Sequence, residues 1–82
     1  MLFMVEMCLH PGHKARAVEA FESQGPNRYS GVALRSAWIG SREEVVYVLV
    51  ECESEALVQK ACEAWSEHGE PKIQPVVDIQ QY

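Results

Sequence analysis

The sequence predicts one α+β domain in which two helices cover one face of a four-stranded antiparallel sheet. Three observations indicate this class. The chain has 82 residues, enough for a single domain over residues 1–82 and too few for two. Its composition, 48% hydrophobic and 23% charged, is close to that of an average globular protein. Short apolar runs alternate along the chain with segments of helix-forming residues.

The first half of the chain predicts a strand, a helix and a second strand. Leu2–Leu9 is an almost wholly apolar run that a Pro-Gly pair ends, as expected of a buried central strand. Residues 13–23 are rich in Lys, Ala, Arg and Glu, so we expect a helix there. Residues 24–31 gather Gly, Pro, Asn and Ser and are predicted to form a loop. Residues 32–39 are the second extended run.

The second half predicts a hairpin, a helix and a last strand. Residues 40–44 are short enough to connect two antiparallel strands, and residues 45–52 form the third strand. A helix is predicted over residues 54–69, where a serine N-cap begins it and a glycine favours its end. His68 in its last turn suits the negative end of the helix dipole. Residues 73–79 resume extended character, so the order β-α-β-β-α-β is that of the ferredoxin-like fold.

Alternation along the strands separates the side chains into two faces. The set predicted to meet the helices is Phe3, Val5, Met7 and Leu9 on the first strand and Val46, Val48 and Val50 on the third. The opposite set is Leu2, Met4, Glu6, Cys8 and His10 on the first strand and Val45, Tyr47, Leu49 and Glu51 on the third. This second face is too apolar to lie in water, so we expect a symmetric homodimer with its sheets face to face. The alternative is a monomer whose last residues or loop fold over the face.

Charge and motif content exclude several classes of function. The net charge is −5, and the seven Lys and Arg residues are spread singly, so binding to nucleic acid or to an anionic membrane is not expected. No apolar run approaches the length of a signal core or a membrane span. The three cysteines form no CxxC pair, which favours reduced thiols and a cytoplasmic location. No phosphate-binding loop or nucleophile-elbow motif occurs, and no cofactor is predicted.

Three stretches carry a resemblance to a known family. They are the opening MLFMVEMCLHPGH, the Gly31-Val32 entry to a strand that ends at Trp38, and the AxxAW spacing of Ala61 to Trp65 ahead of PVVD at 75–78. Together they resemble a family of short uncharacterised bacterial proteins, over nearly the whole chain. The resemblance implies the dimeric α/β-barrel version of the ferredoxin-like fold. Relatives on this architecture include antibiotic-biosynthesis monooxygenases, stress-responsive barrel proteins and muconolactone isomerases, whose pockets lie between sheet and helices or at the dimer interface.

Cys8, His10 and His13 form the sharpest local cluster of possible metal ligands. Cys8 and His10 are two positions apart on one strand face, and His13 follows across a Pro-Gly turn. Zinc and copper take thiolate and imidazole ligands, so these three groups with Glu6 or water would make an open site. The alternative is a buried thiol and two loop histidines near a helix N-terminus.

Glu6 and Glu51 are predicted to point to the same face of neighbouring central strands. A carboxylate away from water resists ionisation unless it is paired, so Glu6 is a candidate general base, and His10 is a second candidate. Arg35 on the second strand is the expected structural partner of the carboxylates if it shares their face, in an ion pair across the dimer interface.

Aromatic, apolar and charged residues on or near that face are the candidate contacts of a flat small molecule. They are Met4, Tyr29, Arg35, Trp38, Tyr47 and Glu51. Trp65 lies on the apolar stripe of its helix and is predicted to belong to the core.

The favoured function is a small dimeric module that binds a small apolar or aromatic molecule or acts by assembly. The first alternative is a cofactor-independent enzyme of the monooxygenase or isomerase type, with Glu6 or His10 as base. The second is soft-metal binding at Cys8, His10 and His13.

Overall fold

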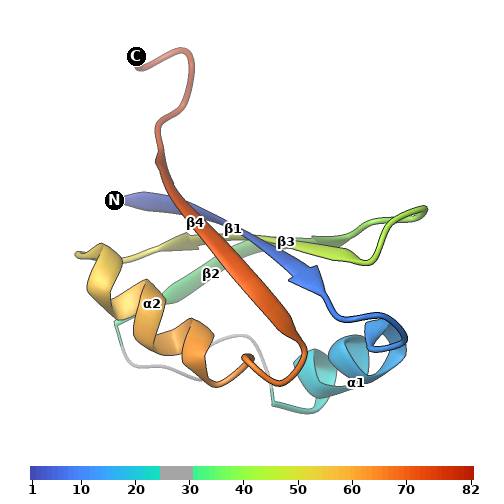
Figure 1. Ribbon diagram of the computed structural model, residues 1–82. Coiled ribbons are helices and arrows are strands. Elements are labelled where there is room, and N and C mark those ends of the chain that lie inside the picture. The colour runs from blue at the N-terminus through green and yellow to red at the C-terminus, as the bar shows by residue number, and fades with distance from the viewer. Residues whose placement is uncertain (25–30) are drawn as a thin grey trace.

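Residues 1–24 and 31–82 of the chain are described by the structure, a computed structural model. In chain order the elements are β1 (Leu2–Leu9), α1 (Lys14–Gln24), β2 (Ala33–Ile39), β3 (Val45–Glu51), α2 (Glu55–Glu63) and β4 (Gly69–Val76). The strands form one antiparallel sheet in the order β2-β3-β1-β4, with both helices on the same side of it (Figure 1). This arrangement confirms the predicted ferredoxin-like fold. The predicted loop over residues 24–31 lies, apart from its two ends, outside the described residues.

The second half of the chain differs from its prediction in where α2 ends and β4 begins. α2 ends at Glu63 instead of continuing to Gly69, and β4 covers Gly69–Val76 instead of residues 73–79. The predicted strand began after Pro71, whereas the observed strand includes it. Proline cannot donate a hydrogen bond to a neighbouring strand. β4 is an edge strand that pairs only with β1, so it tolerates Pro71 and Pro75 within its length.

The segment between α2 and β4 folds into turns. Ser54 caps the start of α2, where its Oγ accepts a hydrogen bond from the Leu57 N–H at 3.4 Å. After the helix, the Trp65 N–H donates to the Cys62 carbonyl and the His68 N–H donates to the Trp65 carbonyl, each at 2.9 Å. These turns bury His68, which is 7% exposed, outside any helix. The helix-dipole interpretation of this histidine is therefore wrong.

Two clusters of buried side chains join the helices to the sheet. The cluster under α2 consists of Phe3, Val5, Val50, Cys52, Val58 and Cys62. The cluster under α1 consists of Met7, Leu9 and Ala17, with Val46 and Trp65 packed against it. All the β1 residues predicted to face the helices are buried, which confirms the predicted division of that strand into two faces.

The other side of the sheet, called the open face below, carries the remaining alternate residues. The strand register places Leu2, Met4, Glu6 and Cys8 of β1 beside Glu51, Leu49, Tyr47 and Val45 of β3. β4 adds Glu70, Lys72, Gln74 and Val76, and β2 adds Ala33, Ser36 and Trp38 together with Arg35, which lies at a bulge and pairs with Glu51. Within the described part of the chain, no helix covers this face (Figure 1).

Gly69 stands where the start of β4 comes close to the end of β1. A Cβ at this position would lie 2.3 Å from the Cys8 carbonyl oxygen and 2.8 Å from the Leu9 Cα, and both are backbone atoms. We expect Gly69→Ala to lower the free energy of unfolding by about 1 to 3 kcal/mol, because the two strands must separate to admit the methyl group. Glu70→Ala, at the adjacent exposed position, is the control and should change it by less than about 0.5 kcal/mol. Urea unfolding measures both, and equal midpoints would contradict the close approach.

Candidate functional site

An apolar cavity of about 340 Å³ lies between the sheet and the two helices. Its floor is the helix-facing side of the sheet, with Val46, Val48 and Val50 from β3 and Leu34, Ala37 and Ile39 from β2. Its walls are Ala17, Val18 and Phe21 from α1 and Val58, Ala61 and Cys62 from α2, with Trp65 just after α2. Small-molecule sites in proteins span roughly 300 to 1,000 Å³ and are mostly apolar, so this cavity falls within their range of size and composition.

The cavity exists because the helices leave β2 uncovered. α2 lies against β4, and α1 packs on the sheet through Ala17, which contacts the cluster of Met7 and Leu9 (Figure 1). β2 has no buried residue, and Trp38 and Ile39 are 53% and 38% exposed. The apolar residues on the helix side of β2 and β3 therefore border a space, although Val50 of β3 is also buried in the cluster under α2.

The start of α1 is tied to the connection between β2 and β3. The Lys14 ammonium Nζ donates a hydrogen bond to the Gly40 carbonyl at 2.7 Å. The Gly12 N–H donates to the Glu44 carboxylate Oε1 at 3.2 Å. These bonds fix the N-terminal end of α1, and the later turns of the helix carry Phe21 to the cavity wall.

The cavity is almost free of charge. Glu22, which is exposed, is the one charged side chain among the described residues that line it. Burial raises the pKa of the Cys62 thiol from its ordinary value of 9.0 to about 11, so at neutral pH this group is a thiol and not a thiolate nucleophile. The rings of Phe21 and Trp65 lie with their centroids 6.3 Å apart in the wall. These surroundings suit an uncharged apolar or aromatic molecule.

The residues predicted to contact a ligand are divided between the two sides of the sheet. Trp38 belongs to the open face by its register with Tyr47, and it also borders the cavity at the edge strand β2. Met4, Tyr47 and Glu51 belong to the open face by their register, and Arg35 joins them through its ion pair with Glu51. Tyr29 lies outside the described residues. A ligand role for the open-face residues stays a prediction. The predicted ligand contacts did not indicate the cavity, because most residues that line it are not among them.

Glu6 and Glu51 share the open face, as predicted, but they do not form a pair. Glu6 stands opposite Tyr47 on β3 and opposite Lys72 on β4, whereas Glu51 stands opposite Leu2. Four positions along β1 separate them, or about 13 Å. Arg35 pairs with Glu51 within one chain, whereas an ion pair across the dimer interface stays a prediction. The two side chains are 57% and 41% exposed, so the pair contributes about 1 kcal/mol at most.

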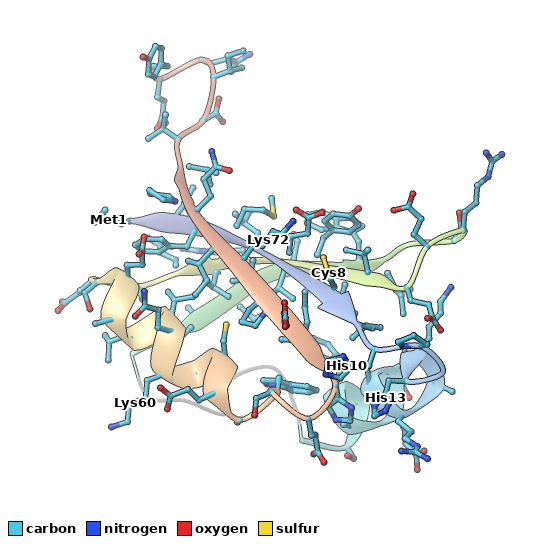
Figure 2. All side chains as sticks on the ribbon, in the orientation of Figure 1. Met1, Cys8, His10, His13, Lys60 and Lys72 are labelled. Atoms are coloured by element: carbon cyan, nitrogen blue, oxygen red, sulfur yellow. The ribbon has the colours of Figure 1, made fainter. Side chains whose placement is uncertain are left out.

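The structure brings His10 and His13 together but leaves Cys8 apart from them. Cys8 lies on the open face opposite Val45 and Glu70, whereas His10 follows the end of β1, and Figure 2 shows its ring on the α1 side of the strand. Across residues 1–24 and 31–82, no group of three His, Cys, Asp or Glu side chains has the geometry to hold a metal ion. As placed here, the three residues do not form a ligand set, and soft-metal binding stays a prediction.

The three histidines lie in a row with Trp65. The sequence did not predict that His68 belongs to this row. The ring centroids of His10 and His13 are 5.7 Å apart, those of His13 and His68 are 6.0 Å apart, and those of His68 and Trp65 are 5.8 Å apart. The Nδ1 atoms of His13 and His68 are buried without a hydrogen-bond partner among the described residues. His68 reaches this row because the chain turns after α2, a feature that the predicted longer helix hid.

The topology and the cavity define a small ferredoxin-like α+β domain with an apolar space between sheet and helices. The chain belongs to the family described as a domain of unknown function, DUF3303, whose profile matches residues 1–82. No curated protein matches the chain, and no solved structure matches it. Among the helices that the structure describes, none is long and apolar enough to cross a membrane.

Cys62 gives the site a signature in the pH dependence of stability. Because burial raises its pKa from 9.0 to about 11, folding favours the protonated thiol. This contribution is complete below about pH 9 and is lost as the pH rises through about 11. Between these values the wild type should lose about 2 kcal/mol more of its unfolding free energy than Cys62→Ala does. Urea unfolding across this pH range measures the difference, and parallel curves would show that the thiol is not shielded from water.

Proposed function

We propose that this protein is a homodimer of the dimeric α/β-barrel type in which each subunit binds a small, uncharged apolar or aromatic molecule. The observation that carries the ligand is the 340 Å³ cavity with its apolar lining. Side chains around an unfilled space lack contacts that a packed interior would give them. A molecule that fills the space supplies these contacts, so its binding should raise the free energy of unfolding.

The dimensions of the cavity limit the ligand. An apolar cavity of about 150 Å³ is large enough to bind benzene. At about 340 Å³, this one accommodates one or two fused or linked rings, or an aliphatic chain of similar volume. The aromatic side chains of Phe21 and Trp65 favour a flat molecule, which can lie against a ring face or edge.

A binding role has better support than catalysis by the candidate bases. Glu6 lies on the open face, on the other side of the sheet from the cavity, and His10 is exposed beyond the end of β1. Neither residue lines the cavity. The thiol of Cys62 does, but it is protonated at neutral pH. The cavity offers contact area and shape, with Glu22 as the one ionisable carboxylate on its described border.

The open face supports the dimer. Leu2, Met4, Leu49, Tyr47 and Val76 give it a largely apolar surface with no covering element among the described residues. Its charged residues are Glu6, Glu51 and Glu70 against Arg35 and Lys72, so it carries only one of the five net negative charges of the chain. Two copies can therefore approach through this face without strong repulsion. Contact between the two sheets removes the apolar surface from water.

Filling the cavity should abolish ligand binding. We expect the neutral dye N-phenyl-1-naphthylamine, which fluoresces in apolar surroundings, to bind the wild type, and Ala61→Phe to weaken its binding at least tenfold because the new ring occupies the cavity. Ala56→Phe places the same ring on the exposed side of α2 and should leave the dye affinity unchanged. Fluorescence titration measures all three. Absence of binding to the wild type, or equal affinity in Ala61→Phe, would contradict the proposal, and native mass spectrometry of fresh protein would reveal a retained ligand.

A charge at the centre of the open face should dissociate the dimer. Leu49 of β3 lies there beside Met4, so Leu49→Lys would bury an unpaired ammonium group in the contact between the sheets. Sedimentation should give twice the chain mass of 9.2 kDa for the wild type and the single mass for the variant. Gln59→Lys on the exposed side of α2 is the matched control. A wild type that is monomeric at high concentration would remove the dimer from the proposal and leave the cavity.

A further inference from the structure

The end of the chain forms an apolar arm that contacts little of its own domain. Residues 77–82 follow β4, and Figure 1 shows them leaving the sheet and projecting away from both helices. Val77, Ile79 and Tyr82 are 65%, 89% and 99% exposed. Side chains of this size and exposure in one short segment are unfavourable in water unless another surface covers them.

The arm has the pattern of a half-buried extended segment. Val77 and Ile79 alternate with Asp78 and Gln80 in the sequence, a pattern that places both aliphatic side chains on one side when the backbone is extended. A local turn gives the arm shape: the Gln80 N–H donates to the Asp78 carboxylate Oδ1 at 2.8 Å, and the Gln81 N–H donates to the Asp78 carbonyl at 2.9 Å. The arm thus ends in a turn and leaves its large apolar side chains exposed.

A hollow of about 190 Å³ lies at the root of the arm. It is lined by Met1, Leu2, Pro75, Val76 and Val77, at the ends of β1 and β4. It exceeds the cavity of about 150 Å³ that binds benzene, so one large aliphatic or aromatic side chain fits into it. The arm of the same chain leads away from this hollow (Figure 1).

We propose that two copies of this chain exchange their arms, so that the arm of each copy inserts Ile79 into the hollow of the other and covers part of its open face. This inference rests on the homodimer proposed above and adds the contact that closes it. A two-fold axis makes the exchange symmetric, because each copy supplies one arm and one hollow. No other partner is needed to cover both apolar features at once.

The reach of the arm and the charge of the face agree with this exchange. The exchange opens the turn at Asp78, and residues 77–82 then span about 20 Å when extended, whereas the outer strands of a four-stranded sheet are about 14 Å apart. The arm can therefore cross a neighbouring sheet. Asp78 is its one charged side chain, and the open face offers Lys72 on β4, for which the described residues supply no ion pair. An attraction between these groups would favour the arm over the open face.

The test compares three changes in the arm of the full chain by the dimer dissociation constant in analytical ultracentrifugation. Removal of residues 77–82 and the substitution Ile79→Asp should each raise the constant at least tenfold, because the apolar contact is lost. Gln80→Asp adds the same charge at the neighbouring position on the polar side of the arm and should raise it less than threefold. Circular dichroism and dye binding in the cavity should be unchanged in all three, which separates this proposal from the ligand site.

Cross-linking shows directly which chain the arm touches. Benzoylphenylalanine in place of Ile79 should, on illumination, give a product of twice the chain mass in which the link maps near Met1 or Val76. A dimer that survives removal of the arm, or a link confined to one chain, would overturn the exchange and leave the contact between sheets standing. A wild type that stays monomeric at all concentrations would overturn both the exchange of arms and the homodimer, and would leave the ligand site in the cavity untouched.

Discussion

The alternation of side chains along β1 is the constraint on which the rest of the structure depends. This strand lies between β3 and β4, so both of its edges are hydrogen-bonded and its register cannot slip without reversing every side chain. Phe3 and Val5 anchor α2, and Met7 and Leu9 anchor α1. The intervening residues Leu2, Met4, Glu6 and Cys8 form the centre of the open face. One short apolar run therefore positions both helices and also creates the surface that neither helix covers.

Most of the fold could be predicted from the sequence because the determining signals are local. β1 begins and ends at its predicted residues, since the apolar run and the Pro-Gly pair define it without help from the rest of the chain. The predicted boundary between α2 and β4 was wrong because the signals that determine it are not local. Whether Pro71 can lie in a strand depends on that strand being at the edge of the sheet, and the need for a glycine at position 69 depends on the nearby Cys8 carbonyl. Both facts concern tertiary neighbours.

The candidate site was less accessible to sequence reasoning. The sequence predicts that the valines on the helix side of β3 face the helices, but alternation shows only which way a side chain points and not whether a helix lies above it. The cavity follows from the positions of α1 and α2 over the sheet, which are three-dimensional facts. The ion pair of Arg35 with Glu51 was predictable, since strand order and charge alone suggested it. The row of histidines was hidden by the misplaced end of α2.

The cavity and the open face lie on opposite sides of the same strands, yet they can act independently. Val48 lines the cavity, while its neighbours Tyr47 and Leu49 belong to the open face, so β3 serves both sides. The hydrogen-bonded ladders hold the sheet as one unit, and a change on one side need not move the other. The adaptable side of the cavity is α1, which is fixed at its start by Lys14 and contacts the sheet mainly through Ala17. A ligand of different size would therefore displace the later turns of α1, and the sheet that faces a second subunit would keep its shape.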